Sequence, residues 1–170
     1  FKGAVIQMFS HGIMTALLFA LIGMVYGRTH TRIIPQMGGL AKRMPVTHAT
    51  FLVATLAISG IWPLAGFFSK DEILAAALGN HYYVIFALAL CVAGLTAFYM
   101  FRIYFVTFWG KERSDGARHA REAPVVMLVP LAVLAVLSAV TGFVPMAKFV
   151  SIGGELEHHG INLAVALPAT

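Results

Sequence analysis

The stretch "SGIWPLAGFFSKDEILAAAL" (residues 59–78) contains helix-breaking residues followed by three consecutive charges, in a chain that has few charges elsewhere. Pro63 lacks a backbone donor and clashes with the preceding helical turn, and Gly60 and Gly66 loosen the backbone on either side of it. A helix that begins near Val46 should therefore break here, after about 17 residues or roughly 25 Å of helical rise.

The charged triplet Lys70-Asp71-Glu72 follows this break, and two structures are compatible with it. In the first, the helix nearly crosses a membrane and the triplet lies in water on the far side. In the second, the helix is discontinuous: the chain unwinds inside the membrane, places Lys70 at a hydrated midplane and resumes as a helix. Irregular backbone at that depth is tolerated only where it lines a cavity. The spacing alone leaves both structures open.

The composition indicates a membrane protein. The 170 residues are 59% hydrophobic and 11% charged, with a mean hydropathy of +0.84. Soluble domains are closer to half apolar and a quarter charged, so the excess indicates that a bilayer is the solvent. The single cysteine, Cys91, lies in an apolar run, which argues against disulfide and CxxC chemistry. The chain does not begin with Met, and we expect it to be an internal fragment of a larger protein.

Four long runs almost without charge predict an all-α, polytopic transmembrane helical bundle that forms a single membrane domain over residues 1–170. The expected helices cover about 4–26, 46–62 with a continuation at 70–79 after the break, 83–109 and 124–146. The basic side chains gather in the two loops 27–45 and 110–123, which are separated by two crossings. The positive-inside rule therefore predicts that both loops are cytoplasmic.

Three segments carry a resemblance to a known family: "PLAGFFSKDEIL" (63–74), "GLTAFYMFRIYFVTFWGKER" (94–113) and "EAPVVMLVPLAVLAVLSAVTGFVP" (122–145). Over about residues 37–145 the chain resembles the L-type (chain 5) antiporter-like subunit of proton-translocating NADH:quinone oxidoreductase, respiratory complex I. Over about residues 1–40, "QMFSHGIMTALLF" and "YGRTHTR" look more like the M-type (chain 4) sister subunit. The resemblance implies a fragment of an antiporter-like fold with one discontinuous helix.

The resemblance also implies which residues carry protons. It makes Lys70 the central carrier in the discontinuous helix and His11 a relay, and we expect Asp71 to be the outward partner of Lys70. Histidine exchanges protons near neutral pH without perturbation, whereas lysine does so only where burial or a nearby charge disfavours its charged form. Moving one charge across the membrane costs about 2.3 kcal/mol per 100 mV, and we expect other subunits to supply that work.

Secondary candidates each have a purely structural alternative. Gln7 and Thr15 lie one turn on either side of His11 and share its face, where they could hold water or hydrogen-bond neighbouring helices. His48 is a candidate for proton entry at the membrane edge, and Arg102 either tunes the path or extends to the interface. Glu72 has no assigned role. The secondary candidates are therefore Gln7, Thr15, His48, Glu72 and Arg102.

The functional expectation is a proton-translocating membrane-arm subunit that is part of an enzyme complex and has no redox site of its own. No GxGxxG, P-loop or CxxC cluster occurs in the chain, so NADH, FMN, iron–sulfur clusters and quinone would belong to partner subunits. The expected partners are the other membrane-arm subunits and the lipid bilayer of a bacterial or mitochondrial inner membrane, and no nucleic acid. Two alternatives are the large subunit of a multi-subunit Na+/H+ antiporter or membrane-bound hydrogenase, and a structural membrane anchor without transport.

Overall fold

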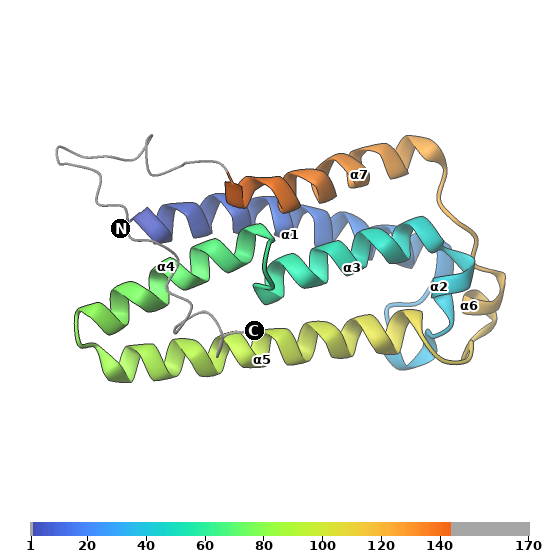
Figure 1. The fold of residues 1–170 in the computed structure, drawn as a ribbon. Helices are drawn as coiled ribbons and strands as arrows, with labels where there is room; N and C mark the ends of the chain where they lie inside the picture. Colours follow the sequence, from blue (N-terminus) through green and yellow to red (C-terminus); the bar gives the residue numbers. More distant parts are fainter. Residues whose placement is uncertain (1, 144–170) are drawn as a thin grey trace.

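The computed structural model describes residues 2–143 of the protein, and within this range every regular element is helical. Figure 1 shows a bundle whose main helices are α1 (Lys2–Thr29), α3 (Pro45–Ser59), α4 (Ala65–Gly79), α5 (Tyr83–Phe108) and α7 (Val125–Val140). Three of its helical segments, Gly3–Thr29, Tyr83–Phe108 and Val125–Phe143, are long and apolar enough to cross a membrane. The predicted all-α transmembrane bundle is confirmed.

Helices α3 and α4 follow one another with a break that lies midway along the bundle (Figure 1). Each has 15 residues, too few to span a bilayer by itself. Helix α3 ends at Gly60, whose φ of 82° is left-handed. The N–H of Gly60 donates to the Ala57 carbonyl at 3.2 Å and that of Ile61 to the Leu56 carbonyl at 3.2 Å. This pair of bonds is the Schellman arrangement that commonly ends a helix.

The second half-helix begins earlier than the sequence predicts. Helix α4 starts at Ala65 rather than at about residue 70, because proline disrupts only the turn that precedes it and leaves the following residues free to be helical. The irregular backbone is therefore confined to residues 60–64, and Lys70 lies in the second turn of α4. At the other end of the chain, α7 ends at Val140 and a 3-10 turn covers Thr141–Phe143, while residues 144–146 of the predicted last helix lie outside the described residues.

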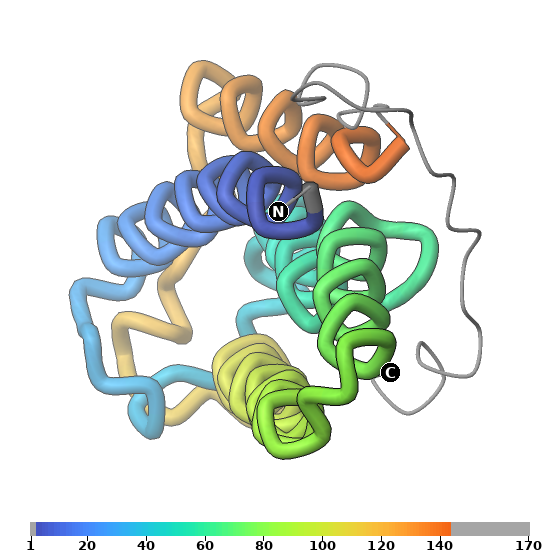
Figure 2. The backbone as a smooth tube through the Cα atoms, turned by 90° about the vertical axis from the view of Figure 1, so that its left-hand side faces the viewer, coloured from blue at the N-terminus to red at the C-terminus, as the bar shows by residue number. Residues whose placement is uncertain are grey.

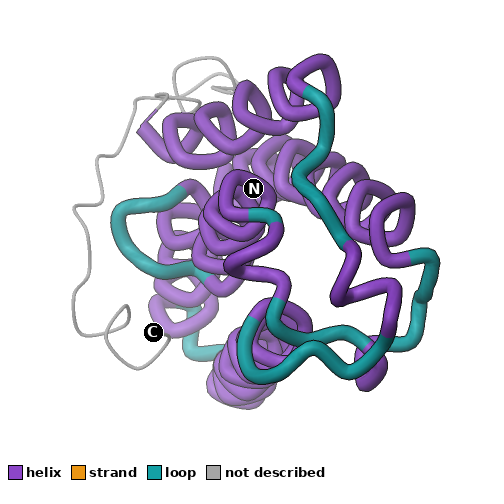
Figure 3. The backbone as a smooth tube through the Cα atoms, turned by 90° about the vertical axis from the view of Figure 1, so that its right-hand side faces the viewer, coloured by secondary structure: helices purple, strands orange, loops and turns teal. Residues whose placement is uncertain are grey.

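The two basic loops pack against each other at one end of the bundle, seen end-on in Figure 3. They contain short elements that the sequence did not predict: a 3-10 turn (Ile34–Gln36), α2 (Leu40–Arg43) and α6 (Asp115–His119). The N–H of Gly38 donates to the Thr107 carbonyl at 3.2 Å, and Arg43 lies 3.6 Å from the Glu112 carboxylate. Both loops thus share one end of the bundle, and their cytoplasmic placement stays a prediction.

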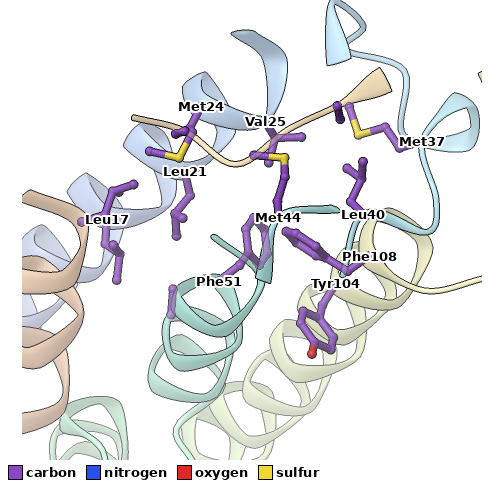
Figure 4. Packing of buried hydrophobic residues seen from close by; sticks show 14 of the residues in the cluster. Leu17, Leu21, Met24, Val25, Met37, Leu40, Met44, Phe51, Tyr104 and Phe108 are labelled. Atoms are coloured by element: carbon purple, nitrogen blue, oxygen red, sulfur yellow. The ribbon is translucent and has the colours of Figure 1, made fainter. Parts of the chain in front are cut away.

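The apolar core lies towards this loop end. Figure 4 shows side chains of α1, α3 and α5 meeting there, with Phe51 and Phe108 rings 5.2 Å apart. Helix α5 has few buried residues over the rest of its length, as its position at the edge of the bundle in Figure 2 illustrates. Several of its large apolar side chains, such as Val84, Leu88 and Phe98, are more than 60% exposed. Such a surface suits contact with lipid or with further transmembrane helices.

The carboxylate of Glu122 caps the start of α3 from a distant part of the chain. It accepts hydrogen bonds from the N–H groups of Val46 at 2.7 Å and Thr47 at 3.3 Å, and from the Thr47 hydroxyl at 2.6 Å. These N–H groups have no partner inside the helix, and a negative charge is favoured at a helix N-terminus. Glu122 therefore orients the first half of the broken crossing.

We expect Glu122→Ala to destabilise the protein by about 1–2 kcal/mol, the usual cost of losing a helix N-cap. Thermal unfolding of the detergent-solubilised full-length protein would measure this as a lower midpoint. Glu112→Ala is the matched control, because its contact with Arg43 at 3.6 Å is a partly exposed ion pair that contributes little. Equal midpoints for the two variants would contradict the capping role.

Candidate functional site

A cavity of about 290 Å³ lies beside the helix break, between α1, the α3–α4 junction and α5. Its walls are mostly apolar, with the side chains of Ile58, Leu74 and Val92 among them. Its polar lining comes from three helices: Gln7, His11, Lys70, Thr96 and Tyr99. Apolar walls with a few convergent polar groups are typical of a functional pocket.

Lys70 projects from α4 onto the end of α3. Its Nζ donates to the Ile58 carbonyl at 2.9 Å and to the Ser59 carbonyl at 3.1 Å. These carbonyls belong to the last turn of α3, where the helix end leaves them without intrahelical partners and where the helix dipole is negative. The break in the helix thus creates the acceptors that hold the lysine.

Two glycines allow the two half-helices to approach. A Cβ on Gly60 would lie 2.9 Å from Lys70 Cδ, and the left-handed φ of this residue disfavours any side chain. A Cβ on Gly66 would lie 2.0 Å from the Ala57 carbonyl oxygen, which is inside van der Waals contact. The glycines that the sequence identifies as breakers therefore also permit the contact that places Lys70.

Helix α1 supplies the facing wall. Ser69 Oγ donates to Gln7 Oε1 at 2.5 Å and links α4 to α1 next to Lys70. His11 lies one turn further along α1 and lines the same cavity, and its Nδ1 is 3.3 Å from Thr15 Oγ1. The structure thus brings Lys70, His11 and Gln7 to one cavity, with Thr15 joined to it through His11.

The other sequence candidates lie apart from the cavity lining. Asp71 and Glu72 are half-buried on α4, and Glu72 faces the start of α1 at Gly3. Arg102 is exposed on α5. His48 lies on the loop-end half of α3, where its Nε2 is 2.5 Å from the Tyr104 hydroxyl and the two rings stack with centroids 5.4 Å apart.

Sequence reasoning missed several polar groups of the site. Ser69 is one residue before Lys70 but faces α1, and Thr96 and Tyr99 reach the cavity from α5. The carbonyls of Ile58 and Ser59 carry no residue-type signal at all. The spacing of Thr96 and Tyr99, three residues apart on one helix face, is the only local hint that they act together.

A bundle with a helix broken midway, and with a lysine on the freed carbonyls beside a polar cavity, has the architecture of an ion-transporting membrane protein. The family model described as "NADH:quinone oxidoreductase/Mrp antiporter, TM" matches residues 1–96, and the chain belongs to this family.

Curated relatives support the same assignment. The chain is 42% identical over 159 residues to NADH-quinone oxidoreductase subunit L of Mycobacterium tuberculosis, an alignment that covers 91% of this chain and 24% of the relative. It is 38% identical over 173 residues to the chloroplastic NAD(P)H-quinone oxidoreductase subunit 5 of Nephroselmis olivacea, covering 92% of this chain and 26% of that protein. The chain therefore spans about a quarter of the length of these relatives, and the L-type resemblance is confirmed.

Solved structures show the same fold. A chain of an archaeal membrane-bound sulfane sulfur reductase superposes with a TM-score of 0.81 at 28% identity, covering 91% of this chain and 27% of that one. A chain of the Mrp complex from Dietzia sp. superposes with a TM-score of 0.76 at 20% identity, covering 99% of this chain and 36% of that one. Because the Mrp complex chain is only 20% identical, its superposition shows a shared fold and nothing further.

Proposed function

We propose that this chain is the proton-translocating part of an L-type, antiporter-like membrane-arm subunit of an NADH:quinone oxidoreductase. The observation that carries the proposal is that Lys70 and His11, from two different helices, line one cavity at the helix break. Ionisable groups inside a membrane segment are costly and are retained mainly for transport or relay. The names of the relatives and the family model support the same class.

In the proposed mechanism, Lys70 alternates between an ammonium and a neutral amine. As an ammonium it is held by the Ile58 and Ser59 carbonyls, which accept its hydrogen bonds. A change of charge elsewhere in the complex displaces the proton towards Asp71 and the outer side. Reprotonation comes from the cytoplasmic side, with His11 as a relay across the cavity.

The redox chemistry belongs to other subunits in this proposal. NADH, FMN, iron–sulfur clusters and quinone would be bound by partners in the complex, and the chain would contact other membrane-arm subunits and lipid. The membrane would be a bacterial or mitochondrial inner membrane, with the loops 27–45 and 110–123 on the cytoplasmic side. Proton pumping by vesicles that carry Lys70→Ala tests the carrier role, and loss of pumping is the expected result.

The large subunit of a sodium/proton antiporter is the second candidate, favoured by the fold shared with the Mrp complex chain. Transport assays with a pH dye and a sodium dye in the same vesicles distinguish the two. NADH-driven proton movement without sodium dependence supports the proposal, whereas sodium-dependent proton movement in the absence of NADH supports the antiporter.

Thiol labelling distinguishes a membrane-embedded Lys70 from a solvated loop in a structural anchor. In the full-length subunit with Cys91→Ser, we expect Lys70→Cys to be protected from a bulky membrane-impermeant reagent, because residue 70 is half-buried at the break. His81→Cys, at the exposed α4–α5 turn, is the control that should label freely. Equal labelling at both positions would exclude the midplane placement.

A further inference from the structure

Two buried hydroxyls of α3 have no hydrogen-bond partner among the described residues. They belong to Thr55, which is 0% exposed, and Ser59, which is 1% exposed. The other buried threonines of α3 are bonded, Thr47 to Glu122 and Thr50 to the Val46 carbonyl at 2.6 Å. Buried polar groups are almost always satisfied, and where protein offers no partner an ordered water usually does so.

These hydroxyls lie on one face of α3 together with His48. Thr55 and Ser59 follow His48 by 7 and 11 positions, so all three lie within about 20° of one direction around the helix axis. His48 contacts α5, since its Nε2 is 2.5 Å from the Tyr104 hydroxyl. The face that carries the two hydroxyls is therefore directed at α5.

Helix α5 has two alanines at the same two spacings from Tyr104, in the opposite direction along the chain. It runs antiparallel to α3 (Figure 1), and Ala97 and Ala93 precede Tyr104 by 7 and 11 positions. With Tyr104 opposite His48, Ala97 falls opposite Thr55 and Ala93 opposite Ser59. This register places a small side chain opposite each of the two hydroxyls, and Ala93 also lines the cavity of Lys70.

We propose that Thr55 and Ser59 hold a file of ordered water between α3 and α5, which joins the His48–Tyr104 pair to the Lys70 cavity. The distance along α3 from His48 to Ser59 is about 16 Å, and Thr55 divides it into steps of about 10 Å and 6 Å. A chain of hydrogen-bonded waters bridges each step, because one water can join only two groups about 5–6 Å apart. Each water accepts one proton and passes one on, and the neutral amine of Lys70 takes the last. This route of proton uptake from the loop end rests on the proposed function of Lys70.

Leu52 occupies the same face between His48 and Thr55. Its apolar side chain would make the first step the drier part of the file, and the two hydroxyls would hold water in the part nearest Lys70. Water would thus remain next to Lys70, and proton transfer past Leu52 would be the slowest step of uptake from the loop end.

High-resolution structure determination of the intact complex tests the file directly. We expect waters within hydrogen-bonding distance of Thr55 Oγ1 and Ser59 Oγ. Hydroxyls bonded to backbone carbonyls of α3, with no water between α3 and α5, would overturn the proposal.

Pumping assays test what the file does. In the full-length subunit within its complex, Thr55→Val should slow proton delivery through this subunit roughly tenfold, because it removes a relay and keeps the side-chain shape. Thr55→Ser keeps the hydroxyl and should therefore deliver protons at close to the rate of the unsubstituted protein. If Thr55 is only structural, Thr55→Val should leave pumping unchanged. It should also stabilise the fold, because a methyl group replaces an unpaired buried hydroxyl.

Ala97→Leu provides an independent obstruction, with Ala87→Leu on the exposed face of α5 as the matched control. Slower pumping with Ala97→Leu alone supports the file, and equal pumping in both variants counts against it. Lys70→Ala separates the two proposals. If it abolishes pumping while Thr55→Val and Ala97→Leu have no effect, the carrier stands and the water file fails; if Lys70→Ala pumps normally, the carrier role itself fails.

Discussion

Lys70→Ala in the full-length subunit is expected to reduce proton translocation through that subunit by roughly a hundredfold, the lower end of what a positioned proton carrier contributes. The variant removes the only described ammonium that lines the cavity and leaves the Ile58 and Ser59 carbonyls facing it. Proton pumping by sealed inverted vesicles, normalised to NADH oxidation and to the amount of assembled complex, measures the effect. Normal pumping in assembled complex would refute the carrier role.

Lys70→Arg distinguishes a carrier from a fixed charge. Arginine keeps the positive charge and can bond the same carbonyls, but it does not release its proton in proteins. We therefore expect assembly to survive and pumping to be lost as in Lys70→Ala. Pumping retained with arginine would mean that only the charge matters.

His11→Ala should give a smaller loss than Lys70→Ala, because waters in the same cavity can replace a relay more easily than they replace the carrier. Thr15→Ala should give less still, since Thr15 reaches the cavity only through His11 Nδ1, 3.3 Å from its hydroxyl. A defect of Thr15→Ala equal to that of Lys70→Ala would show that the relay extends further along α1 than we propose.

Gly66→Ala is expected to have the largest effect on folding, with a destabilisation of about 3 kcal/mol, at the upper end for overpacking. The added Cβ would lie 2.0 Å from the Ala57 carbonyl oxygen, so the ends of α3 and α4 must separate. The atoms nearest the new methyl group are backbone atoms of Ala57 and Gly60, so no flexible side chain can move away from it. Thermal unfolding and the yield of assembled complex measure the effect.

Gly79→Ala is the matched control in the same helix. A Cβ at Gly79 meets nothing within 4 Å, so this variant should assemble normally. A Gly66→Ala protein that assembles should still pump poorly, because separating α3 from α4 displaces the α3 carbonyls that hold Lys70. Equal stability of the two variants would contradict the close packing at the junction.

Local sequence was sufficient for the long helices and for the presence of a break after α3. Hydropathy over 20-residue windows defines crossings without any knowledge of their neighbours. Gly60 and Pro63 break the helix through their own backbone properties, which need no tertiary contact, whereas Gly66 lies inside α4. The shared face of Gln7, His11 and Thr15 likewise follows from helical period alone. The start of α4 was misjudged because proline limits the turn before it and not the turn after it.

Only the tertiary structure determines which residues of these helices contact one another. The bond from Ser69 to Gln7 joins residues 62 positions apart, and the cap from Glu122 to Val46 joins residues 76 apart. The partners of Lys70 are carbonyls, which every residue has, so no residue type marks them. The register that we propose, with Ala97 opposite Thr55, likewise depends on α3 and α5 being neighbours. Helical period places side chains on a face, but only packing between helices determines what that face meets.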